Sequence, residues 1–357
     1  MSSVKVFGDS LADSGTFGYK FTIQSADPAN PFLIFPERVA ASFGFDPLCS
    51  FFNFNGTTFV PKTNCTNYAV AGGRVNNLTN TSAPGNAVPF SIPYQMAAGS
   101  ATLAASDLVI IDGGSNDLAD ITGAFLGVST SPTGLATYEA ALDSLLGPGH
   151  AAAIIGVPTS TSLATAGGAY AQALGQSLVA ATKASVLSKG VAKVVLVNSV
   201  DFTVTPRFQA ILGGVAAAGG AAQAAAVQGA VRAWIQAFNA TLVQGLAGTN
   251  VQVFDFYTET NRMVLDPAQF GLTNITTPAC PKVAGGVDTV TGQASLNYPV
   301  TVAACNSASM SANIPVGETS PNWWKSYAFS DNFHPTPQLH QLIAQSISLQ
   351  LARAGWL

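Results

Sequence analysis

Short apolar runs recur along the chain at long intervals, and each is followed closely by glycine or aspartate. Their valine, isoleucine and phenylalanine content is typical of strands. The runs are VKVF from residue 4, TNYAVA from 66, DLVIID from 107, AKVVLVNSV from 192 and VQVFDFY from 251. DLVIID and KVVLVNSV are apolar almost throughout, as expected for strands that are buried on both faces.

Longer stretches between or after these runs carry apolar residues at helical spacing. The clearest helices are predicted over residues 31–43, 169–189, 221–246 and 335–354. In the last of them the apolar face, which we assign to core packing, consists of Leu339, Leu342, Ile343, Ile347 and Leu351. Strands that alternate with helices indicate an α/β protein with a mostly parallel sheet covered on both faces.

No internal repeat and no linker interrupts this alternation, so we expect residues 1–357 to form a single domain. Segments around residues 44–67, 76–99 and 270–324 follow neither pattern and are too long to be plain connections. Segments of that length usually carry function or their own cross-links. We therefore expect them to be loop insertions.

Residues 210–231 read AILGGVAAAGGAAQAAAVQGAV and contain no charged residue. Their apolarity is almost all alanine, and they lack the leucine, isoleucine and phenylalanine content that drives membrane insertion. We predict a helical hairpin or a flexible cover here and no transmembrane segment.

Charged residues make up only 9% of the chain, and the net charge is −4. An average soluble protein has about 25% charged residues. The chain has no basic cluster, so it lacks the electrostatic footprint of a nucleic-acid-binding protein and offers little attraction to anionic membranes. These observations exclude nucleic acid as the expected partner.

Four cysteines occur without any Cys-x-x-Cys spacing, and the chain has only three histidines, which argues against a zinc site. Of three pairings we favour the two local ones, Cys49–Cys65 and Cys280–Cys305, each stabilising the fold by roughly 3 kcal/mol in the chain-entropy model. Disulfides persist in oxidising compartments. We therefore expect a secreted, periplasmic or cell-surface protein whose signal peptide is absent from this chain.

The first strand-like run ends in Gly8, Asp9 and Ser10, and three later motifs also fall beyond strand ends or just before the final helix. These motifs place Gly72 and Gly73 after NYAVA, Ser115 and Asn116 after DLVIIDGG, and Asp331 and His334 in DNFH. In an open α/β sheet, ligands bind beyond the carboxyl ends of the strands.

Acyl transfer by a serine needs a base, a carboxylate that orients the base, and donors for the developing oxyanion. His334 is the candidate base and Asp331 the candidate carboxylate. The candidate oxyanion donors are the backbone N–H groups of Ser10 and Gly72 and the side-chain amide of Asn116. Together these residues favour Ser10 as a nucleophile over an ordinary turn serine.

Ser115 is a rival nucleophile because GGSND is similar to the Gly-x-Ser-x-Gly elbow of α/β-hydrolases. Its fifth residue is Asp117 where that tight turn needs a small residue. We therefore rank Ser115 below Ser10. We expect Asp9 and Asp117 to hold their loops through hydrogen bonds, and His150 and His340 to be loop and helix-face residues.

Taken in order, GDSL, the glycine after NYAVA, GSND and DNFH resemble the motifs of the GDSL esterases and lipases, in the SGNH hydrolase superfamily. The resemblance runs from Val6 to Pro337. It implies a three-layer α/β/α sandwich with a mostly parallel, flavodoxin-like sheet. The motif LADSG and the large size are similar to the bacterial extracellular branch.

Carried over by residue, the resemblance implies that Ser10 is the nucleophile, His334 the base and Asp331 the acid. Asn116 and Gly72 match the oxyanion residues, with Gly73 as a competitor for the place of Gly72. It implies no metal and no organic cofactor. We expect a monomer that acts on a small-molecule or lipid ester.

The expected function is that of a secreted serine esterase or lipase that hydrolyses carboxylic esters through an acyl-enzyme. An acyltransferase or a polysaccharide O-acetylesterase would use the same site. A non-catalytic adhesion or glycan-binding protein is the alternative of another class. The phenylalanine-rich segments NPFLIFP and CSFFNFNGTTF favour an apolar acyl or aromatic group in the substrate. The alternative for these phenylalanines is core packing, which is the more common assignment for each one taken singly.

Overall fold

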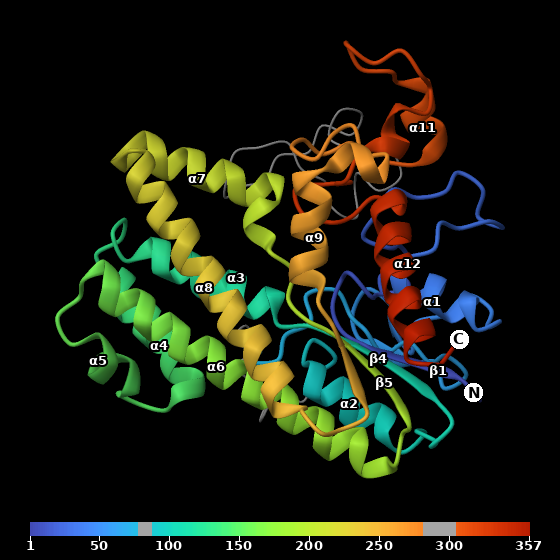
Figure 1. Ribbon diagram of the computed structural model, residues 1–357, viewed down its shortest axis with the longest axis horizontal. Coiled ribbons are helices and arrows are strands. Elements are labelled where there is room, and N and C mark those ends of the chain that lie inside the picture. Colours follow the sequence, from blue (N-terminus) through green and yellow to red (C-terminus); the bar gives the residue numbers. More distant parts are fainter. Residues whose placement is uncertain (78–87, 281–304) are drawn as a thin grey trace.

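The computed structural model describes residues 1–77, 88–280 and 305–357. Within these residues, four parallel strands form the central sheet in the order β1–β4–β5–β6 (Figure 1). They are β1 (Val4–Phe7), β4 (Leu108–Asp112), β5 (Lys193–Val197) and β6 (Val251–Phe254). Val6 pairs with Ile110, which pairs in turn with Val195, so the carboxyl ends of the strands align at one edge. The expected α/β class with a mostly parallel sheet is confirmed.

The strand expected at residue 66 is not a regular strand, which corrects that prediction. Residues 66–71 are extended and lie beside β1, where Tyr68 N donates to Val6 O at 2.8 Å and Val70 N donates to Gly8 O at 3.2 Å. On its other side, Asn67 O accepts from Phe51 N at 2.6 Å. These contacts amount to single bridges at Asn67, to Val6 and to Ser50, and not to a regular ladder. If this segment is counted as a further strand of the sheet, next to β1, the strand order is the flavodoxin-like order that the resemblance implies.

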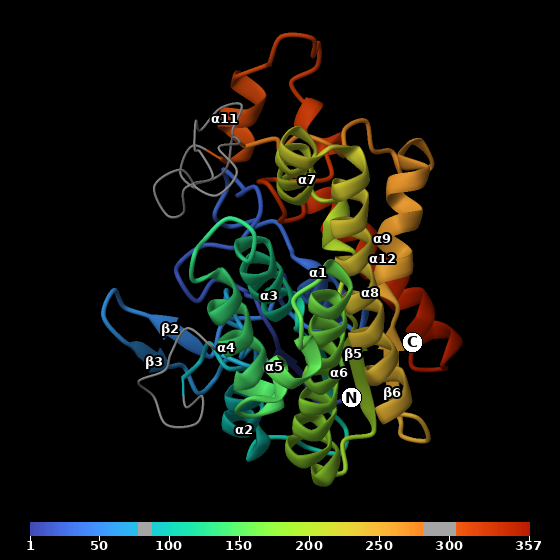
Figure 2. The ribbon, with the colours of Figure 1, turned by 90° about the vertical axis from the view of Figure 1, so that its left-hand side faces the viewer.

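Helices cover both faces of the sheet, and Figure 2 shows the layers from the side. One side has α2 (Ile92–Ser100), α3 (Ser115–Gly127), α4 (Gly134–Leu146), α5 (His150–Ile155), α6 (Ser160–Ser185) and α8 (Ala221–Gly245). The other has α1 (Phe35–Ser42), α9 (Phe256–Leu265) and α12 (Pro337–Arg353). Alternate strand residues serve the two cores, since Val109 and Ile111 pack on the first side while Leu108 and Ile110 pack on the second.

The four expected helices are all present as α1, α6, α8 and α12, but some begin at other residues. The start of α6 is Ser160, well before the expected residue 169, because the hydroxyl of Thr159 accepts the N–H of Ser162 as a cap. Thr336 caps α12 in the same way through Leu339 N. The remaining short helices are η2 (Leu187–Lys189), η3 (Phe202–Val204), η4 (Pro267–Phe270), α11 (Ser307–Ala312) and η5 (Trp323–Ser326).

Residues 210–231 form most of a helical hairpin, which was one of the two predicted alternatives. Its arms are α7 (Pro206–Gly219) and α8, and the chain reverses at Gly220, where φ is +87°. That backbone conformation favours glycine. Among the helices that the structure describes, none is long and apolar enough to cross a membrane.

The three expected insertions contain regular elements that the pattern did not predict. The first holds a small antiparallel hairpin of β2 (Phe52–Phe54) and β3 (Phe59–Pro61), and the second holds α2. The buried face of α2 includes Gln95 and Gly99, so it lacks a helical stripe of apolar residues. Residues 78–87 and 281–304 of these insertions lie outside the described residues. Two disulfides join Cys49 to Cys65 and Cys280 to Cys305.

Candidate active site

Ser10 lies just beyond the carboxyl end of β1, where the chain passes close to the end of β4. A side chain at Gly8 would put its Cβ 3.1 Å from both Cβ and the carbonyl oxygen of Asp112, so the close approach needs a glycine. The side-chain amide of Gln95 hydrogen-bonds to both the backbone N–H and the backbone carbonyl of Gly8. Gly8 N donates to its Oε1 at 2.8 Å, and its Nε2 donates to Gly8 O at 3.0 Å.

Ser10, His334 and Asp331 form a continuous hydrogen-bonded chain at this edge of the sheet. Ser10 Oγ lies 2.8 Å from His334 Nε2, although the two residues are 324 positions apart. His334 Nδ1 lies 2.6 Å from Asp331 Oδ2. All three side chains are buried, with exposures of 7% for Ser10, 4% for His334 and 2% for Asp331. The three candidate residues therefore have the geometry that serine acyl transfer needs.

The carboxylate of Asp331 is held in its charged form. Burial alone would raise its pKa, but the charge of His334 and the hydrogen bonds to Asp331 keep the pKa below the ordinary value. Two of these bonds come from the backbone, since Phe333 N donates to Oδ1 at 2.8 Å and His334 N donates to it at 2.6 Å. Asp331 is thus ionised at neutral pH and can stabilise a protonated His334.

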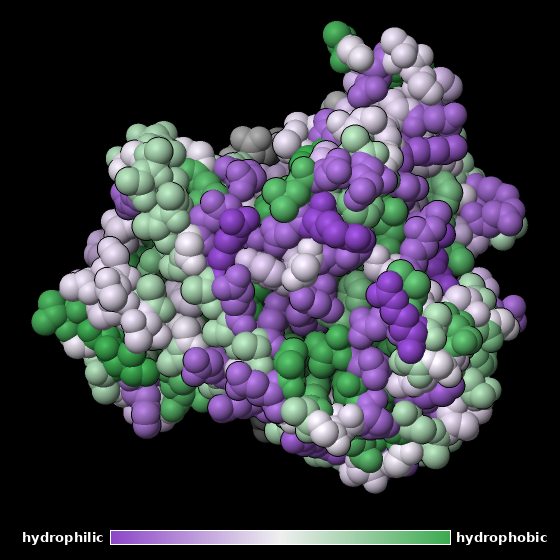
Figure 3. Space-filling model, viewed as in Figure 1, coloured by the Kyte–Doolittle hydropathy of each residue, from purple (hydrophilic) through white to green (hydrophobic). Residues whose placement is uncertain are grey.

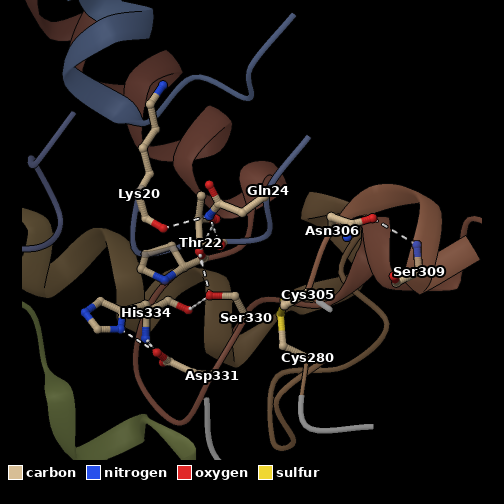
Figure 4. Close-up of a disulfide and its surroundings, with 11 residues drawn as sticks. Lys20, Thr22, Gln24, Cys280, Cys305, Asn306, Ser309, Ser330, Asp331 and His334 are labelled. Carbon is tan, nitrogen blue, oxygen red and sulfur yellow. Dashed lines mark hydrogen bonds and ion pairs between the residues drawn. A yellow bond between two sulfur atoms is a disulfide. The ribbon is translucent and has the colours of Figure 1, made fainter. Parts of the chain in front are cut away.

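Figure 4 shows the Cys280–Cys305 disulfide beside the loop that carries Asp331 and His334. Cys280 N donates to Ser330 O at 2.9 Å, which joins the cross-linked segment directly to this loop. The hydroxyl of Ser330 donates in turn to His334 O at 3.0 Å. The disulfide therefore anchors the backbone that positions the candidate base.

The two glycines after NYAVA have different roles. Gly73 N donates to Val70 O at 2.9 Å, and a Cβ on Gly73 would lie 2.6 Å from Gly8 O. Gly72 has φ of +81°, and in the described part of the chain its N–H, like that of Ser10, donates to no protein acceptor. Gly73 thus closes the turn against the strand-end loop, and Gly72 keeps a backbone donor for a ligand.

Asn116 lies in the first turn of α3 and connects the other site loops. Its Nδ2 donates to Asp9 Oδ2 at 3.2 Å and to Gly73 O at 3.1 Å. Both bonds are at the long end of the usual range. An oxyanion would have to share or replace one of them to accept from this amide.

Ser115, the rival nucleophile, has a different partner. Its Oγ lies 2.9 Å from Ser199 Oγ, whereas the imidazole of His334 is bonded to Ser10. The other histidines also lie apart from this chain. His340 is buried in α12 and accepts from Phe35 N at 3.2 Å, and His150 is exposed at the start of α5. Burial lowers the pKa of His340 well below the ordinary value, so its imidazole is neutral.

The expected loop-holding roles of Asp9 and Asp117 are confirmed by their hydrogen bonds. Asp9 Oδ1 accepts from Leu11 N at 3.0 Å. The two carboxylate oxygens of Asp117 accept from Val75 N at 3.0 Å and from Asn76 N at 2.6 Å. These bonds connect the loop that contains Gly72 and Gly73 to α3. Burial raises the pKa of Asp117 to about 7 against these two donors.

Asp112 and Asp13 are supporting residues that sequence reasoning missed. Burial raises the pKa of Asp112 well above the ordinary value, as do the charge of Asp9 and the hydrogen bond that joins the two carboxyls, so Asp112 is the protonated partner. Asp13, fully buried, accepts from Thr16 N at 2.8 Å and from Ala71 N at 2.9 Å. For Asp13, its place in the LADSG motif was the one sequence feature that could have indicated a supporting role. Asp112 had no such feature.

A groove of about 1700 Å³ opens at this chain of residues. Ser10, Asn116 and His334 line one end, and the rest lies among α3, the start of α6 and the α7–α8 hairpin. The phenylalanine-rich segments do not line it, and their phenylalanines follow the alternative of core packing. Phe51 stacks on Tyr68 with ring centroids 4.3 Å apart, and Phe59 packs on Phe90 at 5.3 Å. Within the described residues, no group of three or more His, Cys, Asp or Glu is placed to hold a metal ion.

The fold is of the α/β class with its candidate site at one edge of the sheet, and comparison with known proteins assigns the family. The chain belongs to the GDSL-like lipase/acylhydrolase family, whose model matches residues 4–347. This confirms the resemblance seen in the motifs and makes the protein a carboxylic ester hydrolase. Phospholipase A1 from Streptomyces albidoflavus NA297 is similar at 14% identity and a TM-score of 0.36, covering 97% of this chain and 98% of that chain. No curated protein matches.

Proposed function

We propose that this protein hydrolyses carboxylic esters with Ser10 as nucleophile, His334 as general base and acid, and Asp331 as the residue that orients His334. The observation that carries the proposal is the pair of short contacts on His334. Its Nε2 is 2.8 Å from Ser10 Oγ, and its Nδ1 is 2.6 Å from Asp331 Oδ2. Few structural roles need a serine, an imidazole and a carboxylate in this order.

In the first half of the reaction, His334 Nε2 takes the proton of Ser10 as Oγ attacks the ester carbonyl carbon. The C=O bond becomes a C–O⁻ bond, and the tetrahedral intermediate then breaks its bond to the alcohol oxygen. That oxygen receives the proton from His334 and leaves as the alcohol. In the second half, water gives a proton to His334 and attacks the acyl-enzyme, which releases the acid and restores Ser10.

The oxyanion is held by the N–H groups of Ser10 and Gly72 and by the amide of Asn116. The choice of Gly72 over Gly73 rests on hydrogen bonding, because Gly73 N already donates to Val70 O at 2.9 Å. Asn116 lies in the first turn of α3, where the positive end of the helix dipole adds to the field on a developing negative charge. The two backbone donors are preorganised and lower the barrier without reorganisation, whereas the amide of Asn116 has to share or exchange one of its present bonds.

Two disulfides favour an oxidising compartment, and we place the protein outside the cytoplasm on that ground. Reduced cysteines in the protein from its natural source would argue against this assignment. A direct measurement is mass spectrometry of the protein isolated from its natural source, with and without reduction before alkylation.

Turnover of p-nitrophenyl butyrate by Ser10→Ala tests the nucleophile, with Ser115→Ala as the matched control. Ser10→Ala should reduce turnover to the rate of hydrolysis without enzyme, while circular dichroism shows that the variant keeps the native fold. Ser115→Ala should lower turnover far less. If Ser10→Ala stays active and Ser115→Ala does not, the assignment of the nucleophile is wrong.

A further inference from the structure

The groove that opens at Ser10 continues far beyond the reacting atoms. One wall is α3, which lines the groove from Asn116 to Gly127. The rise of 1.5 Å per helical residue makes this wall about 16 Å long. The opposite wall is the α7–α8 hairpin, which contributes Phe208, Ile211 and Val227 among others. A binding site for a short acyl group needs no wall of this length.

The chemistry of the lining changes along the groove. Its charged residues are Asp9, Arg74, Asp120 and Arg207, and three of these have contacts close to the reacting residues. Arg74 Nη1 donates to Gly72 O at 2.6 Å and Arg74 Nη2 to Asp120 Oδ1 at 3.0 Å, while the guanidinium of Arg207 lies 5.6 Å from the ring centroid of Phe333. The far part is lined by apolar residues such as Phe125, Leu163 and Ile211, with uncharged serines and threonines among them. A charged group would find no ionic partner there among the described residues.

The hairpin itself is suited to cover an apolar ligand. Figure 3 shows weakly polar and apolar residues over α7, whereas strongly polar residues gather over the centre of the same face. Small residues keep the groove open along both walls. A Cβ added to Gly214 on α7 or to Gly123 on α3 would meet no heavy atom within 4 Å, and both glycines line the groove.

We propose that this groove binds a long unbranched aliphatic acyl chain, so that the substrates are long-chain carboxylic esters and not acetyl esters. The inference rests on the proposed function, because the ester carbonyl must lie at Ser10. The leaving oxygen has to lie beside His334 Nε2, and the groove follows α3 away from Asn116. The acyl part of the ester is therefore the part that enters it.

Burial of each additional methylene in an apolar site stabilises the bound state enough to raise kcat/KM by about two- to fourfold. The gain should continue until the groove is filled. Hydrolysis of p-nitrophenyl esters from acetate to palmitate, kept below their aggregation concentrations, measures this dependence. The wild-type protein should show kcat/KM rising with chain length to laurate or beyond.

Gly214→Trp tests the groove, and Gly213→Trp is its matched control. Both glycines are exposed positions of α7 where an added Cβ meets nothing within 4 Å, but only Gly214 lines the groove. Both variants remove a helical glycine, so their effects on helix propensity are alike. The laurate-to-acetate ratio of kcat/KM should fall at least tenfold in Gly214→Trp and stay within twofold of wild type in Gly213→Trp. Should Gly214→Trp fail to fold, Gly123→Trp blocks the opposite wall.

Each result has a separate meaning. A wild-type preference for acetate, or equal ratios in the two α7 variants, would overturn the groove assignment and leave ester hydrolysis by Ser10 standing. Absence of turnover on every ester, from acetate to palmitate, would overturn the proposed function and this inference with it. A ratio that falls only in the variants that line the groove supports both.

Discussion

The amide of Asn116 donates to the carboxylate of Asp9 at 3.2 Å, which links the candidate oxyanion donor to the residue before the candidate nucleophile. Asp9 is buried and is itself hydrogen-bonded to Asp112. The amide is therefore oriented by groups that lie beneath Ser10 and not by the substrate. Such an amide is already held at the site, and it stabilises the oxyanion by sharing or exchanging one of its two long bonds when charge develops.

Replacement of Asn116 by alanine should therefore act on the chemical step. We expect kcat to fall by about a hundredfold or more, the usual effect of losing one oxyanion donor, with KM changed little. Steady-state kinetics on one ester separate the two parameters. A variant with raised KM and unchanged kcat would show that Asn116 binds the ground state and not the oxyanion.

Asp331→Asn should keep the fold and lose most of the turnover. The amide can still occupy the site between Phe333 N and His334 N, but it cannot hold a charged imidazole as the carboxylate does. We expect kcat to drop by about a thousandfold or more, because the amide favours the wrong tautomer of His334 and no longer places a negative charge beside its imidazole. The control is Asp143→Asn, since Asp143 caps the exposed turn before α5 through Gly149 N and Ala151 N. Comparable losses in the two variants would contradict the orienting role.

Removal of the Cys280–Cys305 disulfide should lower activity as well as stability. The double variant Cys280→Ala/Cys305→Ala loosens a segment that donates to Ser330 O at 2.9 Å, in the loop of the candidate base. Cys49→Ala/Cys65→Ala is the control, because a loop of similar length is opened elsewhere. Each should lose about 2–5 kcal/mol of stability. kcat measured well below both melting temperatures should fall more in the first variant, and equal values would contradict the anchoring role.

Much of the site could be predicted because the motifs fall at strand ends, and the carboxyl ends of parallel strands meet at one edge. Ser10 and Asn116 are brought together by that topology, because each follows a strand of the sheet. His334 follows no strand, and its place depends on the loop before α12. Gln95 and Asp112 could not be found in this way. Their roles depend on which side chain fills the space beneath Gly8, and neither a buried glutamine in a short helix nor an aspartate at a strand end carries a periodic signal.

The groove also could not be predicted from the sequence, because it depends on how several helices pack. The hairpin of residues 210–231 could be predicted as helical from its alanine content, but its position over the site depends on packing between α7 and α8 and on the path of α3. The phenylalanine-rich segments left two alternatives, a ligand wall and a core, and the structure has the second. Phe51 packs on Tyr68 and Phe59 on Phe90, and composition alone could not distinguish these alternatives.

Asp117 makes the stability of the protein depend on pH in a direction that can be worked out. Its pKa of about 7 in the folded protein is above the ordinary value of 3.8, mainly because of burial. Between these two values the unfolded chain has lost the proton and the folded protein keeps it, so stability falls as pH rises from about 4 to 7. The shift corresponds to a loss of about 4 kcal/mol at most.

Asp117→Asn removes this titration, while raised carboxyl groups such as Asp13 and Asp112 remain in both proteins and cancel in the comparison. The variant has a single acceptor oxygen for Val75 N and Asn76 N, so it should be less stable than wild type near pH 4, where the folded wild type keeps its proton and the loss of stability has only begun. Because only the wild type loses stability from this residue between pH 4 and 7, the gap should narrow or reverse over that range and stay constant above it. Urea denaturation midpoints from pH 4 to 8 measure the gap, and a difference that does not change with pH would show that the pKa of Asp117 is not raised.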